Sequence, residues 1–137
     1  MASMPIYIAP AALITNHKGQ YLFLQRSHHS KVNAGKWDMS GGKPEPGETL
    51  DQVLGREVRE ETGLHITRVG TLSGTAELVV ADKRIIYLIF ECMADGEAIT
   101  VSTEHEAYKW VDKSEILALD LAPQFRPFFE TFTGKVS

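Results

Sequence analysis

The chain has 137 residues, of which 43% are hydrophobic and 23% charged, and its formal net charge is −4. This length suits one compact domain with a proper core and is too short for two ordinary ones, so we expect a single domain over residues 1–137. The acidic balance argues against a nucleic-acid polymer as ligand, because binding to a phosphate backbone depends on basic surface.

The first part of the chain predicts a β-hairpin followed by a loop. Residues 6–15 are rich in Ile, Ala and Leu and predict a strand, residues 16–19 predict a turn, and residues 20–26 predict a second strand. Residues 27–36 are polar and contain turn-forming residues, so we expect an exposed loop that leads to Trp37 and borders a substrate pocket.

A helix is predicted between Thr49 and Gly63. Thr49 followed three residues later by Gln52 is a capping-box start, and Gly63 stands where a left-handed C-terminal cap is expected. Gly55 lowers helix propensity by about 1 kcal/mol relative to Ala, which suggests close packing at that position. One face turns from apolar to acidic along its length; at 100° per residue it contains Leu50, Val53, Leu54, Glu57, Glu60, Glu61 and Leu64.

The acidic end of this face is unfavourable for a chain without a ligand. Glu57 and Glu61 are like charges four residues apart, and Glu60 and Glu61 lie in the last turn, where the helix dipole disfavours anions. A divalent cation would reverse both effects, and carboxylates without His or Cys companions favour Mg²⁺ or Mn²⁺ over zinc. The alternative is a solvated acidic helix end with no bound ion.

Several short strands and a second helix are predicted after Gly63. The strand signals cover residues 66–75, 76–81, 84–93, 98–101 and 108–111. Asp112 with Glu115 forms a second capping-box pattern, and Pro123 is expected to open a C-terminal helix that runs to about residue 133. The order of elements predicts an α/β or α+β fold with a mixed sheet between helices.

Cys92 is the only cysteine. No intrachain disulfide is therefore available, and a reducing cytoplasm is the expected compartment. Cys92 lies in an apolar run, so we expect it to be buried. No stretch of about 18 apolar residues is present, and we expect no membrane partner.

The spacing of the fixed residues around the predicted helix resembles the Nudix hydrolase superfamily. Gly42 is followed after five residues by Glu48, then after seven by Arg56-Glu57-Val58, then by Glu60-Glu61 and Gly63-Leu64, which matches the family's signature at every fixed position. Trp37 precedes Gly41-Gly42 as in the family's usual lead-in, although Ser40 stands where proline is commonest. We expect that departure to affect loop shape more than chemistry.

The resemblance implies an α/β/α sandwich and the hydrolysis of a nucleoside diphosphate linked to another group. It also implies that Glu57, Glu60 and Glu61 ligate the metal ion and that the carbonyl of Gly42 adds a ligand. Glu48 would support the metal site through water or hydrogen bonds. Arg56 would orient Glu57, with a simple ion pair within the helix as the alternative.

A carboxylate outside the signature is also expected to contribute. The segment from Glu104 to Trp110 is similar to a Glu-His-x-x-x-x-Trp segment of many Nudix chains. Glu104 is therefore the leading candidate for an extra metal ligand or base, with Glu106 as the alternative. Either Glu57 or Glu104 would accept the proton of the attacking water.

The substrate is less specified than the reaction. No proline lies between Pro46 and Pro123, so the downstream proline of many ADP-ribose hydrolases is missing. We expect a small nucleoside triphosphate or related nucleotide, and a homodimer is possible because many relatives are dimers. Two other functions of the same fold are an isopentenyl diphosphate isomerase, which needs a cysteine upstream of the signature, and a nucleotide sensor without turnover.

Overall fold

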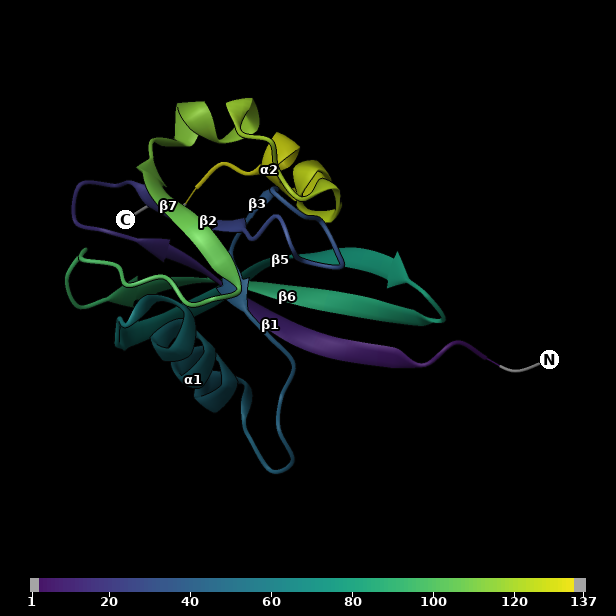
Figure 1. The fold of residues 1–137 in the computed structure, drawn as a ribbon. Helices are drawn as coiled ribbons and strands as arrows, with labels where there is room; N and C mark the ends of the chain where they lie inside the picture. Colours follow the sequence, from purple (N-terminus) through teal and green to yellow (C-terminus); the bar gives the residue numbers. More distant parts are fainter. Residues whose placement is uncertain (1–2, 135–137) are drawn as a thin grey trace.

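The computed structural model describes residues 3–134, which form a mixed β-sheet with helices on both faces (Figure 1). The strands are β1 (Ile6–Thr15), β2 (Tyr21–Arg26), β3 (Trp37–Asp38), β4 (Ser40–Gly41), β5 (Ile66–Val80), β6 (Lys83–Ala94) and β7 (His105–Val111). The helices are α1 (Leu50–Thr62), the 3-10 helices η1 (Lys113–Ala118) and η2 (Pro123–Phe125), and α2 (Arg126–Thr131).

Strand β1 lies at the centre of the sheet. It pairs in parallel with β6 over its whole length, from Ile6 opposite Arg84 to Thr15 opposite Met93. On its other side it pairs antiparallel with β4 and, at Thr15, with β2. Strand β5 continues the sheet beyond β6, and β2 carries β3 and β7, all antiparallel. The sheet is therefore mixed, as predicted.

The core forms two layers, one on each face of the sheet. Helix α1 packs Leu54 and Val58 against Ile14, Leu24 and Cys92 on one face. On the other face the C-terminal helices cover the sheet with a second cluster that contains Phe23, Ile89, Ile116, Phe125 and Phe129. This arrangement confirms the predicted α/β/α sandwich (Figure 1).

The prediction of a strand over residues 98–101 is wrong. The segment has no regular secondary structure and pairs with no strand, and the amide of Thr100 donates to the carbonyl of Thr62 at the end of α1 (3.0 Å). Ile99 and Val101 pack against the α1 side of the core. Their apolar alternation therefore reflects contact with a core cluster and not a place in the sheet.

Other differences concern the boundaries of elements. The two predicted strands over residues 66–81 are one strand, β5, with register shifts against β6 between Val69 and Gly74. The two-residue strands β3 and β4 were too short to give a periodic signal. The C-terminal helix begins at Pro123 as a 3-10 turn, and α2 ends at Thr131.

The expectation of close packing at Gly55 is also wrong. A Cβ atom built there would have no neighbour within 4 Å. Leu50 is likewise more exposed than predicted, and the residues of α1 that are buried on the sheet are Val53, Leu54, Val58, Glu61 and Thr62.

Candidate active site

Helix α1 begins and ends with the caps that the sequence predicts. The hydroxyl of Thr49 accepts from the amide of Gln52, and the Gln52 side chain accepts from the amide of Thr49 (2.9 Å), so the capping box is complete. Gly63 has φ +80°, and its amide donates to the carbonyl of Arg59. These caps fix the register in which Glu61, in the last turn, is buried against the sheet.

Glu61 is the carboxylate that this register buries most deeply, with 6% of its surface exposed. Its Oε1 atom accepts from the Ser40 hydroxyl (2.6 Å) and from the amide of Gly41 (3.0 Å). Burial raises the pKa of Glu61 to about 8, although these hydrogen bonds act in the opposite direction. Ser40 therefore holds a candidate metal ligand directly by a hydrogen bond, which the expectation of an effect mainly on loop shape did not include.

Glu57 lies against the backbone of Gly42. A Cβ atom built on Gly42 would lie 2.5 Å from both Cδ and Oε1 of Glu57, so only glycine leaves room for the carboxylate. Burial raises the pKa of Glu57; the neighbouring Arg56 opposes this, and the charges of Glu60 and Glu104 add to it. The charge of Glu57 in turn raises the pKa of Glu61.

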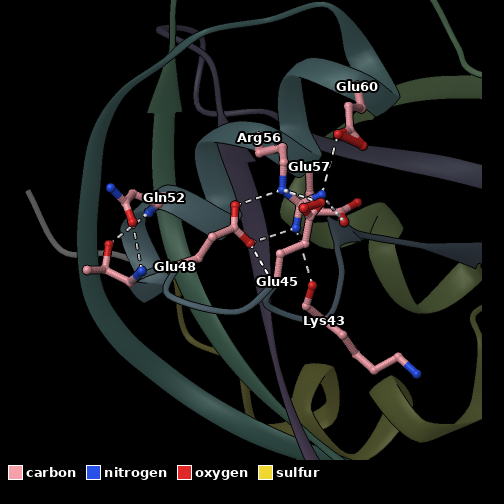
Figure 2. A network of polar contacts seen from close by, with 8 residues as sticks. Lys43, Glu45, Glu48, Gln52, Arg56, Glu57 and Glu60 are labelled. Atoms are coloured by element: carbon pink, nitrogen blue, oxygen red, sulfur yellow. Dashed lines mark hydrogen bonds and ion pairs between the residues drawn. The ribbon is translucent and has the colours of Figure 1, made fainter.

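Arg56 connects the helix to the loop that precedes it (Figure 2). Its Nε and Nη2 atoms donate to the two oxygens of Glu48 (2.8 and 2.9 Å), and Nη1 donates to Oε1 of Glu57 (2.8 Å). The bond to Glu60 is longer, at 3.4 Å, and Nη2 also donates to the carbonyl of Lys43. Hydrogen bonding to Arg56 lowers the pKa of Glu48 to about 2 and raises that of Arg56.

The structure separates the predicted metal residues into two groups. Glu57, Glu61 and Gly42 lie together, whereas Glu48 points to Arg56 and the Glu60 side chain is 57% exposed. Within residues 3–134, no three His, Cys, Asp or Glu side chains converge into a ready-made metal site.

The residues at this position nevertheless fit a divalent cation. Two carboxylates, Glu57 and Glu61, are partly or largely desolvated, and the charge of Glu57 raises the pKa of Glu61. The absence of a side chain on Gly42 leaves room for the Glu57 carboxylate beside the Gly42 backbone. Oxygen ligands of this kind suit Mg²⁺ or Mn²⁺.

A cavity of about 280 Å³ opens beside these carboxylates. Gly41, Gly42 and Glu61 form part of its lining, and apolar side chains of the sheet form much of the rest. The predicted loop over residues 27–36 borders it through Val32 and Asn33, as expected. Trp37 does not line it. The C-terminal side contributes Gln124, whose side-chain oxygen accepts from Asn33 (3.0 Å).

Three charged residues in the cavity wall were missed by the sequence analysis. Arg26 donates from Nη1 to Asp38 (3.3 Å), and Nε2 of His105 lies 3.5 Å from the other Asp38 oxygen. Burial disfavours the charged form of His105, but contact with Asp38 and the charges of Asp38 and Glu61 outweigh it and raise the pKa. His105 could have indicated this cluster from the sequence, because it follows Glu104 in the segment that was considered only for its carboxylates.

Glu104 lies at the surface, immediately before β7. Its backbone carbonyl accepts from the amide of Ser27, which fastens the 27–36 loop to this strand. Its carboxylate is near enough to affect the pKa of Glu57. Glu106, the alternative, forms an ion pair with His28 and so holds the same loop.

Comparison with known proteins gives matches along nearly the whole chain. A model of the NUDIX domain matches residues 6–132. Nucleoside triphosphatase NudI of Enterobacter sp. (strain 638) is 36% identical over 136 aligned positions, which cover 89% of this chain and 92% of that protein.

Solved structures show the same architecture. The MutT protein from Methanosarcina mazei Go1 superposes with a TM-score of 0.85 at 39% identity, covering 95% of this chain and 94% of that one. The E. coli ORF135 protein gives a TM-score of 0.75 at 32% identity and covers 94% of this chain and 89% of its own. No helix within residues 3–134 is long and apolar enough to cross a membrane.

Proposed function

Since this chain belongs to the Nudix family and is a Nudix pyrophosphohydrolase, we propose that it cleaves the pyrophosphate linkage of a nucleoside triphosphate with the help of a divalent cation. The observation that carries the proposal is a pair of desolvated carboxylates beside a cavity of about 280 Å³: Glu61 lines the cavity, and Glu57 lies against Gly42, which also lines it. A cavity of this size with largely apolar walls suits a nucleoside, and the carboxylates lie where its phosphates would emerge.

Glu57, Glu61 and the carbonyl of Gly42 would hold Mg²⁺ or Mn²⁺, with Glu60 turning inward from its exposed position. When bound, the cation supplies charge neutralisation to the phosphoryl oxygens and lowers the pKa of water. The fit rests on the oxygen donors and on the close approach of the Glu57 carboxylate to the Gly42 backbone, which only glycine permits.

The chain's own residues position the reacting groups. Arg56 holds Glu57 through its Nη1 atom while Glu48 fixes the other side of the guanidinium, so the Glu57 carboxylate has one defined orientation. Glu57 accepts the proton of the attacking water, and Glu104 is the second candidate for that role because its charge already reaches Glu57.

The relative NudI is described as a nucleoside triphosphatase, which supports a triphosphate as substrate. The isomerase alternative is not supported, because Cys92 is buried between the sheet and α1 and burial raises its pKa to about 12. Such a thiol does not reach the cavity. A nucleotide sensor of the same fold would bind a nucleotide without releasing phosphate or pyrophosphate.

The test is phosphate and pyrophosphate release from nucleoside triphosphates, nucleotide sugars, dinucleoside polyphosphates and ADP-ribose, with Mg²⁺ or Mn²⁺. We expect metal-dependent turnover of a triphosphate, a loss of at least about 100-fold in kcat with Glu57→Gln, and unchanged turnover with Glu130→Gln on the exposed side of α2. Turnover of no compound by the wild type favours the sensor. Equal turnover by wild type and Glu57→Gln contradicts the assigned base.

A further inference from the structure

Two lysines meet over one aromatic ring at the mouth of the cavity. The Nζ atom of Lys43 lies 4.7 Å from the centroid of the Tyr7 ring, and that of Lys83 lies 5.5 Å from the same centroid. Both distances are within the range of a cation–π interaction. Lys43 and Lys83 both belong to the lining of the cavity that Gly42 and Glu61 border.

Three separate elements bring these side chains together. Tyr7 is opposite Ile85 in the parallel pairing of β1 and β6, and Lys83 is two residues before Ile85, so all three lie on the cavity face of the sheet. Lys43 comes from the opposite side of the site, directly after Gly42. Its carbonyl is held by Arg56, while its side chain runs away from that network, as Figure 2 shows.

The two ammonium groups have no acidic partner among the residues that the structure describes. Among residues 3–134, neither Lys43 nor Lys83 forms an ion pair with a carboxylate, although the chain carries an excess of acidic residues. Two like charges that both lie within 5.5 Å of the same ring centroid form a site that an anion would stabilise.

We propose that Lys43, Lys83 and Tyr7 form a phosphate clamp that binds the terminal phosphoryl groups of the substrate. The substrate class rests on the function proposed above, but the affinity for a phosphate anion belongs to the lysines themselves. Lys43 directly follows Gly42 in sequence, and both lysines line the same cavity as Gly42 and Glu61, so the clamp lies close to the carboxylates. Ammonium groups bind phosphate as point charges and need no fixed fork geometry.

The clamp predicts which compounds the enzyme prefers. A terminal phosphate carries more negative charge than a phosphate esterified to a sugar, and two facing ammonium groups respond to that difference. The clamp therefore selects nucleoside triphosphates over nucleoside diphosphates joined to an uncharged group.

The first test measures binding of inorganic pyrophosphate by calorimetry in EDTA at low salt, where turnover plays no part. We expect Lys83→Met and Lys43→Met each to weaken binding about tenfold and Lys83→Arg to retain most of it. Lys18→Met, in the exposed turn between β1 and β2, serves as the matched control and should bind as the wild type does. Equal binding by the wild type and Lys83→Met overturns the clamp, as does an absence of binding to the wild type.

The second test compares kcat/KM for a nucleoside triphosphate and a nucleotide sugar. Lys83→Met should lower the value for the triphosphate about tenfold and leave that for the sugar nearly unchanged. An equal loss on both substrates overturns the proposed selectivity, and so does a loss of pyrophosphate binding with an unchanged KM for the triphosphate. If the wild type binds pyrophosphate through Lys83 but turns over no compound, the clamp stands and the hydrolase proposal fails.

Discussion

Gly42 precedes α1 and Gly55 lies within it, and the two glycines differ completely in what surrounds them. At Gly42 the space that a Cβ atom would take is filled by the Glu57 carboxylate, 2.5 Å away, whereas at Gly55 that space is open. Both residues lack a side chain, yet only the first owes this to the active site. Gly42 is therefore required to place Glu57, whereas Gly55 lowers helix propensity and makes no close contact that requires a glycine.

Replacing each glycine by alanine should give opposite results. Gly42→Ala displaces Glu57 from Arg56 and from its place beside Glu61, and we expect kcat/KM to fall at least about 100-fold. Gly55→Ala should leave kcat/KM unchanged and stabilise the protein by about 1 kcal/mol, because alanine is the better helix former. Steady-state kinetics and urea unfolding measure the two effects. Full activity in Gly42→Ala would show that Glu57 tolerates another position.

At the scale of elements, the two-residue turn between β5 and β6 fixes where Lys83 begins its strand. Val80 pairs with Lys83, and Ala81 between them has φ +51°, a left-handed conformation that costs a residue with a Cβ atom roughly 1–2 kcal/mol. Asn adopts this conformation more readily, whereas a β-branched residue does so rarely. The turn is thus held by the pairing of its flanking strands against the preference of its own residue.

Substitutions at Ala81 should therefore change stability in opposite directions. We expect Ala81→Asn to raise the free energy of unfolding by roughly 0.5–1 kcal/mol and Ala81→Val to lower it by about 1 kcal/mol. Ala81 is exposed, so burial does not complicate the comparison. Urea denaturation measures the free energy of unfolding of the two variants. A change of the same sign in both would mean that the turn relaxes when Ala81 is replaced.

At the scale of the whole molecule, the burial of Glu61 between β4 and α1 couples folding to pH. Its pKa rises from an ordinary value of 4.5 to about 8, so the folded state binds this proton more tightly than the unfolded state does. The stabilisation is complete below pH 4.5 and is lost as pH rises through about 8. A bound divalent cation would take the place of the proton and remove the loss.

Thermal unfolding in EDTA should therefore show a Tm that falls between about pH 5 and about pH 8. Glu61→Gln, which cannot ionise, should flatten this dependence, whereas Glu130→Gln should keep it. Added Mg²⁺ should raise the Tm of the wild type more at the higher pH. An equal increase at both pH values would mean that Mg²⁺ binds without displacing a proton from Glu61.

Local patterns predicted local structure well, and contacts between distant segments accounted for the errors. The caps at Thr49 and Gly63 defined α1 because capping is a matter of neighbouring residues. The alternation over residues 98–101 was misleading, since core contact gives the same pattern as a strand. The parallel pairing of β1 with β6 joins distant segments, and neither strand's own sequence identifies the other as its partner.

The candidate site divides in the same way. Glu57 and Glu61 could be found because they recur at helical spacing within one segment. The Arg26, Asp38 and His105 cluster comes from three strands, and no spacing in the sequence connects them. The same is true of Tyr7, Lys43 and Lys83, which meet only because β1, β6 and the loop after β4 converge at one edge of the cavity.

The position of β1 also constrains the order of events as the chain leaves the ribosome. Each residue of β1 pairs with a residue of β6 that is about 78 positions later in the sequence, beginning with Ile6 and Arg84. Until β6 emerges, β1 can pair only with β2 and β4, and both pairings are short. The central strand is therefore synthesised early, but its hydrogen bonding is completed late. Long-range parallel pairing is slow and exposes apolar edges to association. Chaperones that bind extended apolar segments therefore have their longest opportunity at β1.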